Sequence, residues 1–444
     1  MRAVVIGAVG GLVGGIAGGA FAVAVTQLIK ELLAVVTRQD DWLLLVLPLV
    51  GVALATVVLH LIGHGDAVQH IEAQDVDEPA PRRFRLWRTF PADLARADLT
   101  ADVVRSAGRE EAFPWRLAPV RAVAIMTTVG LGAPMGTEAP AAHLGVAAGA
   151  ALGEATPKRG GWGELARPAA LGGGAAGVAA LIGLPLVGFA FMLELGRRRR
   201  VPISPERVIA AAMGALAGWT INIVFDLNLI RLVVPDLSPG DVPKALLTAL
   251  LVGLVSGSVC SLTGAAIYRC RRWEGNPALK LGIGVVGLAA AALAIGALAT
   301  ATAAVGPGGS AVAWAETFHG ASATLFAVAL LRACATAAAV LGGGCGGVFV
   351  PFLAIGDMAG RAFAPTLGVS SDLAGAAGAA AGIAGGYRLP VTAAMMVIGI
   401  GGPASASLTC LATVGVAAIA GVGSGLALDQ LTKFKPAGAS RRES

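Results

Sequence analysis

The stretch Gly132 to Gly149, GAPMGTEAPAAHLGVAAG, places one carboxylate, Glu138, in an otherwise apolar segment. A carboxylate at the centre of a bilayer costs about 2.5 kcal/mol or more, so it is expected to face a pathway or cavity rather than lipid. Pro140 suits the first turn of a helix, where free backbone N–H groups and the positive helix end favour an anion. A carboxylate that can occupy an anion site can also leave it. The stretch therefore predicts a gated anion site with Glu138 as the gate; the alternative is that Glu138 only caps the helix.

A second stretch repeats this pattern in the other half of the chain. It runs from Gly343 to Gly360, GGCGGVFVPFLAIGDMAG, and aligning Pro351 with Pro140 also aligns the glycines around them. Membrane helices rich in Gly and Ala resemble one another by composition, but here prolines and arginines keep the register as well. Two halves with Gly- and Pro-interrupted apolar segments in corresponding places predict a transporter with a binding site near the membrane midplane.

The order of the motifs resembles that of the CLC family of chloride channels and chloride/proton antiporters. MGTEAP (Met135–Pro140) resembles the family's GREGP gate motif, GGVFVP (Gly346–Pro351) resembles GGIFAP, and GHGDA (Gly63–Ala67) lies where GSGIP is expected. The resemblance implies an all-α polytopic membrane protein of two inverted-topology repeats with tilted and broken helices. It also implies a homodimer with one pore per subunit. The transported partner would be chloride or another small anion, with fluoride possible.

Backbone amides at two helix starts are the expected anion ligands, because a fixed full charge would bind the anion too tightly for release. They are the amides of Thr137, Glu138, Ala139, Val348 and Phe349.

His64 stands where the third motif has a serine. Its imidazole could donate to an anion in a pH-sensitive way; the alternative is a histidine in an exposed loop.

Other departures from the family pattern bear on proton coupling. Thr137 replaces the arginine before the gate, and the inner proton-transfer glutamate of the antiporters aligns with Leu195. The tyrosine of the inner chloride site has no aligned counterpart, since the chain's tyrosines are Tyr268 and Tyr387. Glu194 could start a proton path instead, or could pair with the basic run that follows it. These departures favour passive or weakly proton-coupled anion transport, with proton-coupled fluoride or chloride antiport as the alternative.

Composition excludes other classes of protein. With 56% hydrophobic and 14% charged residues, the chain of 444 residues is a polytopic membrane protein, and we expect no separate soluble domain. The net charge of +6 comes from basic loops that orient membrane proteins, so no nucleic-acid partner is predicted. The scattered cysteines indicate neither disulfides nor a zinc site, and no metal or cofactor is expected. HExxH and GxSxG motifs are absent, so an enzyme is disfavoured, and a carrier of organic solutes is the remaining alternative.

Apolar runs separated by basic loops predict the topology. Residues 1–444 are expected to form one transmembrane domain, with repeat 1 at about 40–230 and repeat 2 at about 245–425. Both termini are predicted to be cytoplasmic, because the Arg-rich loop 66–116, the run Arg197–Arg200 and the tail 433–444 are basic. The expected location of the protein is the plasma membrane. The expected spans of the first half are Val4–Lys30, Trp42–Ile62, Leu117–Gly132, Ala139–Leu152, Ala169–Ile182, Leu186–Leu195 and Val208–Ile223.

Charged residues also lie within apolar segments. Asp357 precedes Arg361 by one helical turn, which predicts a pair rather than an ion site. Arg121, Arg332 and Arg388 lie near expected helix ends, so we expect their side chains to extend toward the membrane surface.

Overall fold

The computed structural model describes residues 1–62, 99, 103, 113, 115–155, 162–198, 201–225, 232, 239–273, 276–402 and 407–432, and these are almost entirely helical. The helices of the first half are α1 (Arg2–Val36), α2 (Asp41–Ile62), η1 (Trp115–Leu117), α5 (Ala118–Gly130), α6 (Glu138–Ala155), η2 (Trp162–Leu165), α7 (Ala166–Ile182), α8 (Pro185–Arg198) and α9 (Pro205–Phe225). Those of the second half are η3 (Pro239–Asp241), α10 (Val242–Arg272), α11 (Pro277–Leu298), α12 (Ala301–Ala304), α13 (Gly309–Thr317), α14 (Ser322–Leu341), α15 (Phe349–Leu367), α16 (Ser371–Tyr387), α17 (Pro390–Gly401) and α18 (Leu408–Thr432).

Seven helices of the described part are long and apolar enough to cross a membrane: α1, α2, α9, α10, α11, α14 and α18. Helices α7 and α17 are apolar but shorter. Between α7 and α8, Gly183 adopts the left-handed conformation that ends a helix, and Pro185 starts the next one. Long spans next to short, broken helices confirm the predicted polytopic all-α membrane fold.

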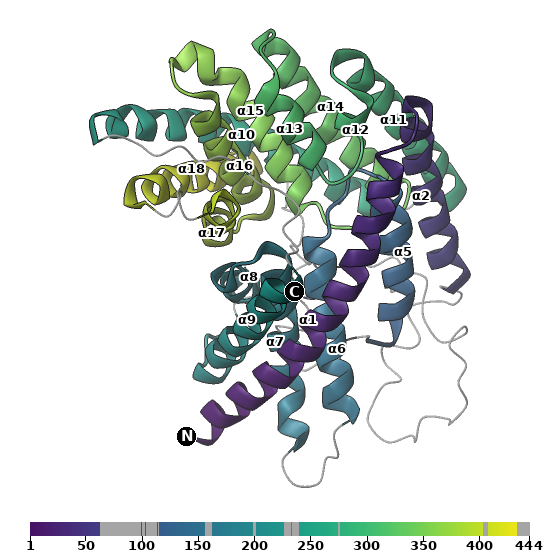
Figure 1. Cartoon of the computed structure of the whole chain (residues 1–444), viewed down its shortest axis with the longest axis vertical. Coiled ribbons are helices and arrows are strands. Elements are labelled where there is room, and N and C mark those ends of the chain that lie inside the picture. Colours follow the sequence, from purple (N-terminus) through teal and green to yellow (C-terminus); the bar gives the residue numbers. More distant parts are fainter. Residues whose placement is uncertain are drawn as a thin grey trace.

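The second half repeats the packing of the first. Helix α1 packs against α5, α6, α7 and α9, and α10 packs against α14, α15, α16 and α18 in the same way. Helix α6 lies against α7 as α15 lies against α16, and α8 against α9 as α17 against α18. Figure 1 shows α6 to α9 gathered at one end of the molecule and α10 to α16 at the other. The fold is thus two inverted repeats of tilted and broken helices, as predicted.

Glycines allow the helices of each repeat to touch backbone to backbone. A Cβ atom at Gly145 of α6 would clash with the carbonyl oxygen of Gly173 in α7. In the second repeat, a Cβ at Gly356 of α15 would clash with the carbonyl oxygen of Gly378 in α16. Gly356 aligns with Gly145 in the repeated sequence, and Gly378 with Gly173. The repeat in the sequence therefore encodes a repeated helix contact.

The two repeats meet at the segments that lead into α6 and α15. The N–H of Gly136 donates to the carbonyl oxygen of Gly347 at 2.6 Å, and the N–H of Gly347 donates to that of Gly136 at 2.8 Å. This isolated antiparallel bridge holds the starts of α6 and α15 together. The N–H of Gly306 adds a hydrogen bond to the carbonyl oxygen of Gly132, at 2.7 Å.

Candidate functional site

Glu138 is the first residue of α6, and only 5% of it is exposed. The hydroxyl of Thr137 donates to Oε1 at 3.3 Å, whereas Oε2 has no hydrogen-bond partner among the residues that the structure describes. The backbone amides of Thr137, Glu138 and Val350 are within reach of the carboxylate. A Cβ atom at Gly136 would come within 2.6 Å of Oε2, so this glycine leaves room for the carboxylate. A carboxylate oxygen is an acceptor, so an unpaired Oε2 can take up a proton or accept a hydrogen bond from a further donor.

The predicted amides lie at two helix starts that the structure brings together. Thr137, Glu138 and Ala139 form the start of α6, and Val348 and Phe349 the start of α15. A Cβ atom at Gly347 would lie 3.3 Å from the amide nitrogen of Ala139, which shows how closely the two starts approach. Both helices direct their positive ends to this place, together with N–H groups that have no carbonyl partner inside the helix. The arrangement can hold an anion without a lysine or arginine.

Tyr387, at the end of α16, contacts the start of α15, which the sequence analysis did not predict. Its hydroxyl accepts a hydrogen bond from the N–H of Val348 at 3.4 Å. The ring is buried and packs against Phe349 and Phe352, with ring centres 5.2 Å and 5.6 Å apart. The signal that could have found it is its place at the end of the helix that pairs with α15.

Glu194 binds the start of a neighbouring helix. Its carboxylate accepts hydrogen bonds from the N–H of Val391 at 3.0 Å and of Thr392 at 2.7 Å, and from the hydroxyl of Thr392. A carboxylate in this position satisfies free N–H groups and the helix dipole of α17. Glu194 therefore joins α8 to α17.

His64 lies outside the described residues, as do the tail 433–444 and most of the loop 66–116. In the part of the chain that is described, no three His, Cys, Asp or Glu side chains are grouped so that they could hold a metal ion.

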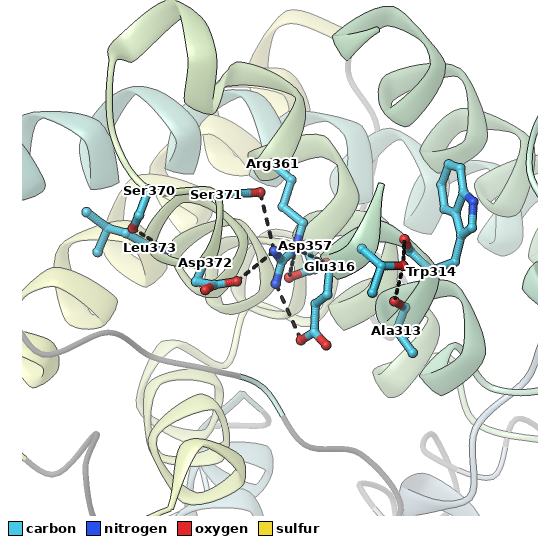
Figure 2. Close-up of polar contacts among 10 residues, drawn as sticks. Ala313, Trp314, Glu316, Asp357, Arg361, Ser370, Ser371, Asp372 and Leu373 are labelled. Carbon is cyan, nitrogen blue, oxygen red and sulfur yellow. Dashed lines mark hydrogen bonds and ion pairs between the residues drawn. The ribbon is translucent and has the colours of Figure 1, made fainter. Parts of the chain in front are cut away.

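Asp357 and Arg361 form the pair that the sequence predicts, and the structure extends it to a network (Figure 2). The Nε of Arg361 donates to both oxygens of Asp357, at 3.1 Å and 3.0 Å, and both side chains are fully buried. The other nitrogens of Arg361 reach Asp372 at 2.9 Å, Ser371 at 3.3 Å and Glu316 at 3.5 Å. One arginine thus joins α13, α15 and the start of α16.

The expectation that Arg121 and Arg332 extend toward the membrane surface is wrong, because both are buried. Arg121 contacts Nε2 of His143 at 3.1 Å. Arg332 donates to two backbone carbonyls, those of Ala303 and, at 2.7 Å, Gly306. These carbonyls lie at the end of the short α12 and in the loop after it, where no helix pairs them.

Arg388 does not extend toward the surface either. It is largely buried and donates to Asp429 at 2.8 Å and to Ser261 at 3.1 Å.

Broken membrane helices whose starts meet at a buried carboxylate define a membrane transport protein rather than an enzyme. The family described as "Voltage gated chloride channel" matches this chain over residues 86–421. The chain therefore belongs to that family.

Similar curated relatives include two H(+)/Cl(-) exchange transporters named ClcA, from Yersinia pestis and Yersinia pseudotuberculosis. Each is 25% identical over 297 residues, which cover 64% of this chain and 60% of the relative. The chain thus spans less than two thirds of the length of these relatives.

Solved structures share the fold. A CLC-type fluoride/proton antiporter has a TM-score of 0.67 at 22% identity and covers 95% of each chain. A slow cyanobacterial Cl⁻/H⁺ antiporter has a TM-score of 0.67 at 19% identity, with 99% of this chain and 96% of the other covered. A eukaryotic CLC transporter has a TM-score of 0.64 at 18% identity, with 96% and 72% covered.

Proposed function

We propose that this protein transports a small anion, chloride or fluoride, across the plasma membrane, with Glu138 as the gate. The observation that carries the proposal is the buried carboxylate of Glu138 at the junction of two helix starts, with Oε2 unpaired among the described residues. An anion and an ionised Glu138 compete there for the same N–H groups. When Glu138 takes up a proton it loses its charge and its preference for this place, so the path opens.

The amides of Thr137, Glu138, Ala139, Val348 and Phe349 are the proposed ligands of the anion. They provide partial positive charges at the ends of α6 and α15, which bind an anion and still release it. His64 remains a proposed additional donor from the loop after α2.

The proposal also includes the exchange of the anion for protons. The relatives from Yersinia are named as exchangers of protons and chloride, and one structural neighbour is titled a fluoride/proton antiporter. These names favour an antiporter over the passive channel that the sequence departures suggest. Leu195 cannot carry a proton, so we propose Glu194 as the inner proton residue and expect the coupling to be weak.

The proposal also includes a homodimer with both termini in the cytoplasm. Apolar side chains are exposed on α8, α9, α17 and α18, among them Leu186, Ile223, Val391 and Ile419. Small residues between them allow close helix packing in a membrane. Counting subunits by single-molecule photobleaching in lipid nanodiscs tests this part, and a monomer would contradict it.

The central experiment measures chloride and fluoride efflux from liposomes that contain the purified protein, at a series of external pH values. For Glu138→Gln we expect flux to persist and its dependence on external pH to flatten, because a neutral amide cannot titrate and competes poorly for the anion site. Glu164→Gln is the control, since Glu164 pairs with Arg2 at the surface. Flux and pH dependence that both stay at the wild-type level would make Glu138 a helix cap only. A wild-type protein without anion flux would refute the proposed function itself.

A further inference from the structure

Two buried polar side chains lie at the start of α15. The carboxylate of Glu138 lies within reach of the Val350 amide, and its Oε2 has no hydrogen-bond partner in the described ranges. The hydroxyl of Tyr387 accepts a hydrogen bond from the N–H of Val348. At the start of this 19-residue helix, the carboxylate of Glu138 therefore lies near the amide of Val350, and the phenol of Tyr387 lies at the amide of Val348.

The contact between Tyr387 and Val348 has a direct consequence for an anion at that amide. In the structure the hydroxyl is the acceptor, with 3.4 Å between the two heavy atoms, which is long for a hydrogen bond. An anion that takes the N–H of Val348 displaces the hydroxyl as its acceptor. A phenol also carries one proton to donate, so the displaced hydroxyl can turn and donate to the same anion.

The ring of Tyr387 is held in place for this role. Only 7% of the residue is exposed, and the ring packs against both Phe349 and Phe352. A phenol fixed by its neighbours loses little conformational entropy when it binds a ligand.

We propose that the hydroxyl of Tyr387 is a side-chain ligand of the transported anion, donating to it at the amide of Val348. This inference rests on the proposed anion transport and adds a residue that sets selectivity. A hydroxyl donor favours anions that accept strong hydrogen bonds, such as chloride and fluoride, over a diffuse anion such as thiocyanate.

The test compares Tyr387→Phe with wild type by calorimetric titration of the purified protein with chloride, fluoride and thiocyanate. Phenylalanine keeps the ring contacts and removes only the hydroxyl. A hydrogen bond to a charged group predicts that chloride and fluoride bind about 10-fold more weakly, whereas thiocyanate changes much less. Tyr268→Phe is the matched control, because it removes the hydroxyl of the other tyrosine, which contacts Arg272 at the exposed end of α10. That control should bind all three anions as the wild type does.

Unchanged affinity for chloride and fluoride in Tyr387→Phe, or an equal loss for all three anions, would overturn the inference. If the wild type transports anions and Tyr387→Phe behaves identically, only this inference is overturned. If the wild type neither binds nor transports chloride or fluoride, the proposed function is refuted, and this inference with it. A second pair, Tyr387→His and Tyr387→Leu, serves if the Phe variant does not fold. The histidine variant retains an N–H donor and must bind chloride more tightly than the leucine variant; equal affinities overturn the proposal.

Discussion

Glu138 and Asp357 are both carboxylates buried in apolar helices, but their surroundings give them different roles. Asp357 accepts hydrogen bonds from Arg361 at both oxygens, and the pair is closed to solvent. Glu138 has one hydroxyl contact and lies beside backbone amides that a free anion can also use. A fully paired carboxylate holds structure together, whereas one with a spare oxygen can exchange partners.

The role of Arg361 can be tested through stability. Arg361→Met removes the charge that compensates Asp357, and a buried charge without its partner costs about 3–5 kcal/mol. We expect a large fall in the melting temperature of the protein in detergent. Asp372→Asn changes the exposed edge of the same network, where a pair contributes about 1 kcal/mol or less. Equal effects of the two substitutions would show that the Asp357–Arg361 pair is not the centre of the network.

At the scale of the helix, the backbone contact between α6 and α7 predicts that a side chain larger than glycine at this contact lowers stability. Gly145→Ala places a methyl group against the carbonyl of Gly173, so we expect a loss of about 1–3 kcal/mol in the free energy of unfolding from overpacking. Gly282→Ala in α11 is the control, because nothing lies within 4 Å of its added Cβ atom. Alanine favours helix over glycine, so that variant should be as stable as wild type or more so. Denaturant titration in detergent measures both, and a stable Gly145→Ala protein would refute the close packing.

The sequence predicted the helices and the repeat because both leave periodic signals. The expected spans agree with α2, α6 and α7 to within a few residues, since apolar runs and prolines mark their ends. The bounds of the two repeats, about 40–230 and about 245–425, stay a prediction.

The sequence could not predict which polar groups meet across helices. Arg332 can be buried because two backbone carbonyls near the end of α12 accept hydrogen bonds from its guanidinium group. A backbone carbonyl without a helical partner leaves no pattern in the sequence that would predict this contact. Tyr387 aligns with Ile182 at the end of α7, so the repeat gave no reason to place a hydroxyl at the proposed anion site. The helix starts were predictable because Gly and Pro mark them, but their polar neighbours come from distant segments.

For the whole molecule, the prediction concerns coupling between anion and proton. An imposed chloride gradient across proteoliposomes should drive protons uphill, because a gate that must be protonated carries its proton with each cycle. We expect Glu194→Gln to reduce this proton movement while anion flux persists. Glu206→Gln, an acidic residue at the start of α9, is the control. The internal pH, followed with a trapped dye, reports the result.

Two outcomes would contradict parts of this scheme. Anion flux with no uphill proton movement in the wild type would make the protein a passive channel. Full proton movement in Glu194→Gln would show that Glu194 is not the inner proton residue and that its role is to bind the start of α17.

The bridge between Gly136 and Gly347 is reciprocal: each glycine gives its partner the same bond that it receives. An ancestral chain of half this length could make both bonds with a second copy of itself, from a single glycine. Duplication and fusion of its gene would keep that contact and free the neighbouring positions to diverge. In the present chain, the residue two places after each bridging glycine is Glu138 in one copy and Phe349 in the other. Divergence at this position leaves a carboxylate beside the bridge in the first half and a phenylalanine in the second, so the two halves of the proposed anion site are chemically unlike.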